Sequence, residues 1–157
     1  MNPWIVACTR AQADAMLPFA TAENWLVEQA APLVAGCRAE LTGLYLATMD
    51  GGVQASIQFW ADGLRDGLSF ANPRDFHLTL ANSPAAKLAI RYNLRGPNYT
   101  LVGGDEATLA ALEHAQDDLA THLIEAAIVI RFDMMPVTSM IGLSLTTISI
   151  SHDNSRK

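Results

Sequence analysis

Short uncharged runs alternate with amphipathic stretches along this chain, a pattern typical of a layered α/β fold. The stretch Leu41–Thr48 is apolar at nearly every position, which predicts a strand that is covered on both faces. The predicted strands are Trp4–Thr9, Leu41–Thr48, Asn98–Val102, Ala126–Met134 and Ser139–Ile150. Pro136 separates the last two, and Asp50-Gly51-Gly52 predicts a turn after the second.

Helical segments are predicted between these strands. The first, Ala11–Ala35, is expected to be divided by Pro18 and Pro32, because proline lacks the N–H group that a helix interior needs. A second helix starts at Val53, and its apolar residues Val53, Ile57, Trp60 and Leu64 recur at helical spacing.

The third and fourth helices are Pro84–Tyr92 and Asp105–His122. Ser83-Pro84 predicts a helix start with serine as N-cap and proline in the first helical position. The expected buried stripe of the fourth helix is Leu109, Leu112, Leu119 and Leu123. The remaining segment, Phe70–Leu80, is interpreted as a loop-rich connection.

This order of elements predicts one α/β domain over residues 1–151, followed by a polar tail at 152–157. The expected sheet has five strands and is mostly parallel, with an antiparallel last strand and helices on both faces.

Half of the residues are hydrophobic and only 17% are charged, which indicates a globular chain with little charge for its surface. The extra apolar surface is explained equally well by a subunit interface or by an alanine- and leucine-rich core. The net charge of −6, without a basic cluster, argues against nucleic acid and against direct capture of an acidic carrier protein.

The two cysteines, Cys8 and Cys37, lie far apart and predict neither a zinc site nor a redox pair. No metal or cofactor is expected. The N-terminal residues lack a signal-peptide pattern, and no apolar run approaches the length of a membrane span. A cytoplasmic protein is therefore expected.

Residues 41–116 carry several short motifs in a fixed order. The segment LTGLYLATMDGGVQASIQFW precedes NPRDFHLTLANSPAAKLAIRYNLRGPNYTL, and a Gly-Gly elbow then leads into a helix. In this order and spacing they resemble the N-terminal half of the β-ketoacyl-acyl carrier protein synthases. The resemblance implies a single thiolase-like half domain, where a ketosynthase contains two such halves.

The resemblance also implies that the catalytic chemistry is missing. The place of the family's nucleophilic cysteine, on the elbow Gly103-Gly104-Asp105, falls on Asp105. The family's two catalytic histidines belong to a C-terminal half that this chain is expected to lack. His77, His114 and His122 match no catalytic position, so no catalytic residue is expected.

Asp105 is open to two interpretations. An aspartate at a helix start stabilises it by roughly 0.5–2 kcal/mol as an N-cap, and Glu106 complements the helix dipole. The alternative is a chemical role, although a carboxylate is a poor acyl acceptor. Chain-length factors, the cysteine-less partners of ketosynthases, commonly carry glutamine here, and Asp105 departs from that pattern as well. The structural interpretation is favoured.

The function that this resemblance implies is that of a half-sized, non-catalytic chain-length-factor-like subunit in aryl polyene, polyketide or fatty-acid-like biosynthesis. It would pair with an active β-ketoacyl-ACP synthase as a heterodimer or larger assembly, shape the acyl channel and serve acyl carrier protein indirectly. The residues expected at the interface and channel are Phe76, His77, Leu78, Thr79, Asn82, Asn98, Tyr99, Thr100, Leu101 and Val102. The alternatives are an acyl-thioester hydrolase or transferase that uses Asp105, and a truncated, inactive ketosynthase remnant.

Overall fold

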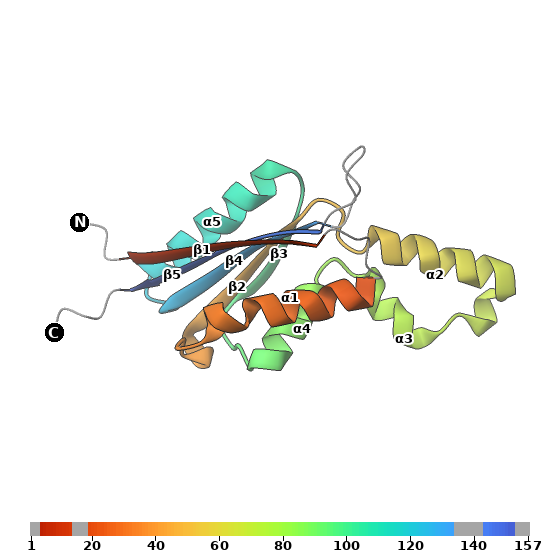
Figure 1. The fold of residues 1–157 in the computed structure, drawn as a ribbon, viewed down its shortest axis with the longest axis horizontal. Coiled ribbons are helices and arrows are strands. Elements are labelled where there is room, and N and C mark those ends of the chain that lie inside the picture. The colour runs from red at the N-terminus through yellow and green to blue at the C-terminus, as the bar shows by residue number, and fades with distance from the viewer. Residues whose placement is uncertain (1–3, 14–18, 134–142, 153–157) are drawn as a thin grey trace.

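The computed structural model describes residues 4–13, 19–133 and 143–152, with side chains described within residues 20–133. The layered α/β fold that the alternating pattern predicted is confirmed (Figure 1). The predicted tail, residues 152–157, lies outside the described residues except for His152, and so do Pro18 and Pro136.

The strands form one sheet in the order β1-β5-β4-β2-β3. At its centre, β2 (Thr42–Thr48) pairs in parallel with both β3 (Asn98–Val102) and β4 (Ala126–Asp133). β5 (Leu143–His152) runs antiparallel to β4, and β1 (Trp4–Ala13) runs antiparallel to β5. The two edges of the sheet are therefore β1 and β3.

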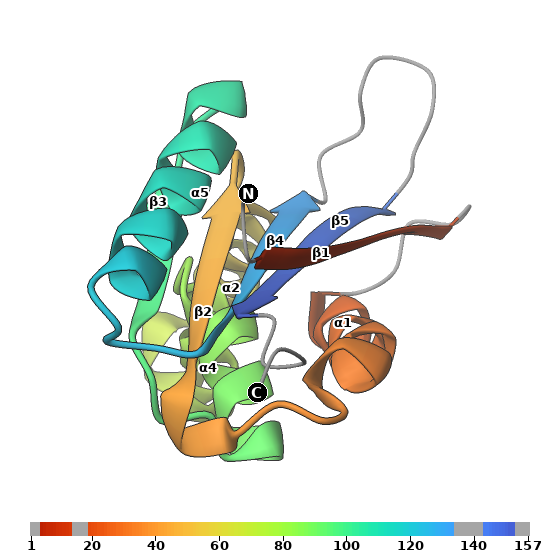
Figure 2. The ribbon, with the colours of Figure 1, turned by 90° about the vertical axis from the view of Figure 1, so that its left-hand side faces the viewer.

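Helices cover both faces of the sheet, as predicted. α1 (Phe19–Val34) and α4 (Ser83–Tyr92) pack against one face, and α5 (Asp105–Ala120) packs against the other (Figure 2). Every residue of β2 is buried, which confirms the prediction of a strand covered on both sides. Alternate residues of the strand serve the two cores: Leu44 and Leu46 face α1 and α4, while Tyr45 and Ala47 face α5.

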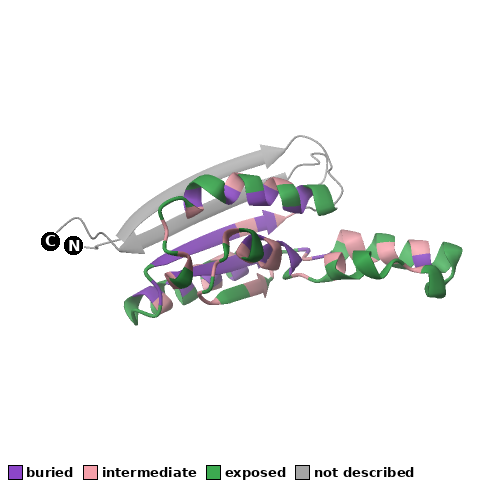
Figure 3. Cartoon of the chain, turned by 90° about the horizontal axis from the view of Figure 1, so that it is seen from below, coloured by how far each residue is buried: buried purple, intermediate pink, exposed green. Residues whose placement is uncertain are grey.

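A helical extension projects beyond the carboxyl ends of the parallel strands (Figures 1 and 3). It consists of α2 (Val53–Asp66), α3 (Pro73–Phe76), and the short 3₁₀ turns Leu68–Phe70 and His77–Thr79. Another 3₁₀ turn, Ala39–Leu41, precedes β2. The predicted apolar stripe of α2 is exposed over its whole length, from Val53 at 48% to Leu64 at 78%.

The predicted division of the first helix at Pro32 is wrong. Pro32 lies inside α1, two residues before its end. The bond that proline cannot donate would have gone to the carbonyl of Glu28, which is exposed and open to water. The start was also misplaced, because β1 continues through Ala13.

The interpretation of Phe70–Leu80 as a loop-rich connection is largely wrong, because this segment contains α3, the whole 3₁₀ turn His77–Thr79 and the last residue of the turn Leu68–Phe70. The Asn72 side chain caps α3 by accepting a hydrogen bond from the Arg74 amide, and Pro73 occupies the first turn. For α4 the same kind of signal was displaced by one residue, since Asn82 is the N-cap and Ser83 is already helical.

The buried stripe of α5 differs from the predicted leucine stripe. Leu119 is buried and Leu112 is partly buried, but Leu109 and Leu123 are more than half exposed. The stripe consists of Ala107, Ala111, Ala115 and Leu119, at intervals of four residues. Small side chains let the helix approach the sheet closely above Tyr45, which takes up the volume that leucines would have filled.

Tyr45 links α5 to the sheet. Its side chain is fully buried, and its hydroxyl donates a 2.6 Å hydrogen bond to the Asp118 carboxylate. Burial, followed by this bond to Asp118, raises the pKa of Tyr45 well above its usual value. The folded state therefore holds the Tyr45 proton more tightly than the unfolded state does, and this stabilisation is lost as the pH rises beyond about 10.

We expect the free energy of unfolding to decline above about pH 10, and to decline less steeply in Tyr45→Phe. At neutral pH the variant should be less stable by about 1–2 kcal/mol, because the partly buried Asp118 loses its donor. Urea unfolding of both proteins between pH 7 and pH 11 measures this difference. Parallel pH profiles would show that Tyr45 does not carry it.

No helix among the described residues is long and apolar enough to cross a membrane.

Candidate functional site

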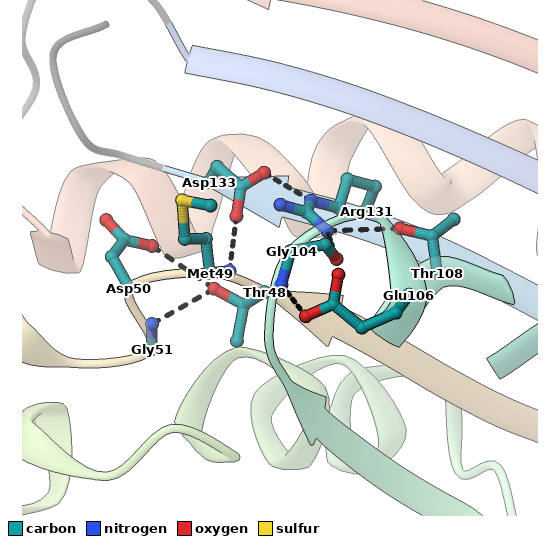
Figure 4. Close-up of polar contacts among 9 residues, drawn as sticks. All are labelled: Thr48, Met49, Asp50, Gly51, Gly104, Glu106, Thr108, Arg131 and Asp133. Carbon is teal, nitrogen blue, oxygen red and sulfur yellow. Dashed lines mark hydrogen bonds and ion pairs between the residues drawn. The ribbon is translucent and has the colours of Figure 1, made fainter. Parts of the chain in front are cut away.

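The elbow at residues 103–105 lies where the parallel strands end. In α/β sheets, ligand sites form outside the carboxyl ends of such strands. The amide of Gly103 donates to the carbonyl of Thr48, at 2.9 Å, so the end of β3 is fastened to the end of β2. Figure 4 shows the polar groups that gather here from β2, β4 and the start of α5.

Asp105 is the first residue of α5 and is exposed. Its side chain makes no hydrogen bond or ion pair with another described residue, so Asp105 is not the capping residue that the sequence suggested. Gly104 occupies the N-cap position and has no side chain to offer. A nucleophile would also need a base within hydrogen-bond reach, and no base among the described residues forms a hydrogen bond with Asp105.

Glu106, one residue later, supplies the missing cap. Its Oε1 accepts a 2.9 Å hydrogen bond from the Gly104 amide (Figure 4). The hydrogen bond from its own amide, the bond from the Gly104 amide and the nearby charge of Arg131 lower the pKa of Glu106. The carboxylate is therefore ionised at neutral pH and lies at the positive end of the α5 dipole.

The elbow glycines leave room for this cap. Neither Gly103 nor Gly104 has a positive φ, so the turn itself does not require glycine at these positions. A Cβ on Gly104 would lie 2.8 Å from Glu106 Oε2, and one on Gly103 would lie 3.1 Å from Oε1. These two glycines therefore leave space for the Glu106 carboxylate.

Arg131, near the end of β4, holds the other side of the elbow. Its Nη1 donates hydrogen bonds to the Gly104 carbonyl at 2.5 Å and to Thr108 Oγ1 at 3.1 Å. Its Nε donates a hydrogen bond to the Asp133 carboxylate. Asp133 in turn accepts a 2.6 Å hydrogen bond from the amide of Met49, just beyond β2. One partly buried ion pair thus ties β2, β4 and α5 together.

The neighbouring turn after β2 is fixed by Thr48. Its hydroxyl donates to Asp50 Oδ1 and accepts a hydrogen bond from the Gly51 amide, which has the positive φ of 50° that favours glycine. The predicted Asp50-Gly51-Gly52 turn is therefore present. Gly52 is pressed against the Leu78–Thr79 backbone, where a Cβ would lie 2.7 Å from the Leu78 carbonyl oxygen.

The backbone of β3 presents alternate residues to the free edge of the sheet. Pro97 accepts from the Leu44 amide and Gly103 donates to Thr48, so both of these residues face β2. Because the two sides of a strand alternate with a period of two residues, Tyr99 and Leu101 also face β2. The amide and carbonyl groups of Asn98, Thr100 and Val102 point away from the sheet.

The side chains of β3 divide between the two faces. Tyr99, at 44% exposure, stacks on Tyr45 beneath it and on His114 of α5, with ring centroids 5.7 and 5.4 Å apart. Leu101 packs against the α5 core. Thr100 lies on the opposite face, and its hydroxyl is buried without a hydrogen-bond partner.

The segment Phe76–Asn82 runs from the last residue of α3, through the 3₁₀ turn His77–Thr79, to the N-cap of α4. Phe76 is 55% exposed and packs edge-on against Phe59 of α2, while Leu78 is turned inward against the core. His77, Thr79 and Asn82 lie in or near the short turn between α3 and α4, with His77 and Asn82 exposed. The turn abuts Gly52, so this segment and the elbow lie at the same end of the sheet.

None of the three histidines that the sequence analysis considered forms a hydrogen bond with Asp105. His77 caps α3, His114 stacks on Tyr99, and His122 follows α5 with a φ of 59°. Among the described residues, no group of three His, Cys, Asp or Glu could hold a metal ion.

Sequence reasoning missed Arg131 and Asp133 and gave Glu106 only a minor part. A signal for this pair was available, because two charges end an otherwise apolar strand, AAIVIRFD. Charged residues at the carboxyl end of a buried strand usually face a site or one another.

Three comparisons place this geometry among known proteins. A family model described as β-ketoacyl synthase, N-terminal domain, matches residues 10–156, so the chain belongs to that family. A search of curated proteins found no match.

The fold is that of a thiolase-like α/β half domain, and solved structures of ketosynthases with chain length factors share it. One is a ketosynthase (ApeO) in complex with its chain length factor (ApeC) from Xenorhabdus doucetiae, with a TM-score of 0.68, 12% identity and coverage of 89% of this chain and 63% of that one. The ishigamide ketosynthase/chain length factor has a TM-score of 0.63 at 19% identity, with coverage of 72% and 36%.

A third structure is a type II polyketide acyl-carrier protein in complex with its ketosynthase (AntDE:AntF), with a TM-score of 0.62 at 11% identity. The match covers 85% of this chain and 46% of that one. The chain thus spans from about a third to just under two thirds of these three relatives. At identities this low, the structural likeness shows a shared fold alone.

Proposed function

We propose that this chain is a non-catalytic subunit, similar to a chain length factor, that pairs with an active β-ketoacyl-ACP synthase in polyene or polyketide biosynthesis. The observation that carries the proposal is the position of β3. This strand leads directly into the elbow and forms a free edge of the sheet, with three outward-facing residues. A free edge of this kind accepts a strand from another protein.

The chemistry of the elbow supports a role without catalysis. Asp105 is exposed, and no base among the described residues forms a hydrogen bond with it. The Glu106 carboxylate accepts the hydrogen bond of the Gly104 amide. A hydrolase or transferase built on Asp105 would need an activating partner, and the described residues supply none. A carboxylate at this position would also repel the carboxylate of a malonyl group.

The exposed apolar surface supports a protein partner. Ile57, Trp60 and Leu64 of α2 are each more than half exposed, and Phe76 lies close to the same helix. Apolar groups clustered in this way are commonly buried in a subunit interface. We place this surface against the ketosynthase, with Phe76 at its acyl channel. Leu78 is turned inward and is less suited to limit the length of the chain.

Co-expression with an active β-ketoacyl synthase from the same genome tests the proposal. We expect the tagged chain to bring down that ketosynthase in a stable complex of defined mass, measured by size-exclusion chromatography with light scattering. A ketosynthase from an unrelated pathway serves as the control. A chain that elutes alone, self-dimerises or aggregates would favour an inactive remnant instead.

The variant Asp105→Ala distinguishes a non-catalytic subunit from an enzyme that uses Asp105. We expect the variant to form the complex and to support product formation within about twofold of the native rate, because the Asp105 side chain is exposed and bonds to no other described side chain. Condensation by the reconstituted pair, followed by mass spectrometry of the products, gives the measurement. Loss of condensation, or turnover of acyl thioesters by the isolated native chain, would contradict the proposal.

A further inference from the structure

The start of α5 is occupied by the chain's own groups. Helix N-termini attract anions because their first amides lack partners within the helix. Here the Glu106 carboxylate accepts from the Gly104 amide, and Arg131 donates to the Gly104 carbonyl. Both backbone groups of the residue that precedes Asp105 are thus engaged within the molecule.

The cap is part of a larger arrangement. Arg131 is only 14% exposed and also binds Thr108 of α5, so it fixes the first turns of the helix relative to β4. Gly104 and Gly103 provide the space that the carboxylate occupies. The two elbow glycines, Glu106 and Thr108 of α5, and Arg131 of β4 therefore fix one another in place.

We propose that Glu106 is a built-in anion that closes the elbow, with Arg131 as the residue that positions it, so that the helix N-terminus cannot activate a nucleophile at position 105. This extends the proposed function, because it assigns the loss of chemistry to two further residues besides Asp105. A cysteine restored at position 105 alone would meet the Glu106 charge in place of a free helix terminus.

The consequence is a difference in thiol acidity. Free amides and the helix dipole lower the pKa of a thiol, whereas an adjacent carboxylate raises it. The charged groups at the elbow are Glu106, Arg131 and Asp133. Removing the charge of Glu106 while Arg131 and Asp133 remain should therefore lower the pKa of a thiol placed at position 105.

The test compares Asp105→Cys with Asp105→Cys/Glu106→Gln, both in a background with Cys8→Ser and Cys37→Ser. The pH dependence of alkylation by iodoacetamide gives the thiol pKa. We expect an ordinary value, near or above about 8.5, in the single variant and a value about one unit lower in the double variant. Equal values in the two proteins would overturn the proposal.

Glu113→Gln provides the matched control, since it removes the same charge from an exposed position two turns further along α5. With Asp105→Cys it should leave the thiol pKa unchanged. A shift as large as that caused by Glu106→Gln would mean that the net charge of the helix, and not the cap, sets the acidity.

Amide hydrogen exchange in the otherwise native chain tests the hydrogen bond separately. Glutamine keeps the acceptor oxygen and alanine removes it, so Gly104 should remain protected in Glu106→Gln and exchange about tenfold faster or more in Glu106→Ala. Unchanged exchange in Glu106→Ala would refute the cap. These measurements need no ketosynthase, so a failure to pair and a failure of this proposal are distinguishable.

Discussion

Gly96→Ala is expected to destabilise the fold by about 3 kcal/mol, among the largest effects of a single methyl group in this chain. A Cβ at this position would lie 2.6 Å from the carbonyl carbon of Thr42 and 2.9 Å from the amide nitrogen of Gly43. Both are backbone atoms of the central strand β2, which is buried throughout and has no room to move.

The turn around Gly96 is also held from both sides. The Arg95 amide donates to the Ala39 carbonyl at 2.9 Å, and the Leu44 amide donates to the Pro97 carbonyl at 2.8 Å. Any shift that relieves the clash would stretch one of these hydrogen bonds and disturb the pairing of β2 with β3. The motif residue Gly96 is therefore explained by the close approach of two backbone segments.

Thermal unfolding measures the effect. For a domain of this size, a loss of about 3 kcal/mol lowers Tm by about 6–12 °C. Gly63→Ala is the control, because its nearest neighbour is the flexible end of the Leu68 side chain and alanine favours the helix interior. If the two variants had equal stabilities, the backbone contact at Gly96 would not be limiting.

The sequence was most informative where one physical effect dominated. The short, mostly apolar run LTGLYLAT predicted β2 because such a run is typical of a strand that is covered on both faces. The strand-elbow-helix order from Asn98 to Asp105 was likewise readable, since glycines interrupt two regular patterns there.

Prediction failed where two effects competed. Leucine spacing suggested the inner face of α5, but the bulk of Tyr45 requires alanines there. Pro32 reads as a helix breaker, yet it costs little beside an exposed helix end. The partners of Arg131, Gly104 and Thr108, lie 27 and 23 positions away, so no local pattern identifies them.

The sequence also did not show which backbone groups of β3 face the free edge, and this decides which residue a test of pairing should change. Tyr99 belongs to the predicted interface, but its amide faces β2 inside the sheet, so Tyr99→Pro would remove a hydrogen bond of the chain's own sheet. That substitution would damage the chain's own fold, so its failure to pair would carry no information. Thr100, one residue further, has its amide on the free edge.

Thr100→Pro is therefore expected to weaken binding of the ketosynthase by at least about tenfold while the isolated chain stays folded. Proline is tolerated on an edge strand when its missing N–H faces outward, but there it removes a donor and places a ring in the path of an added strand. Loss of one hydrogen bond with a steric clash exceeds the 1.4 kcal/mol that corresponds to a tenfold change.

Thr100→Val is the matched control. Valine keeps the backbone amide and the shape of the side chain, and it removes a buried hydroxyl that has no partner, so stability should be unchanged or slightly higher. Circular dichroism and thermal unfolding of both variants establish folding, and titration against the ketosynthase gives the affinities. Native affinity in a folded Thr100→Pro variant would exclude pairing through β3 and leave the exposed apolar residues of α2, Ile57, Trp60 and Leu64, as the remaining contact for the ketosynthase.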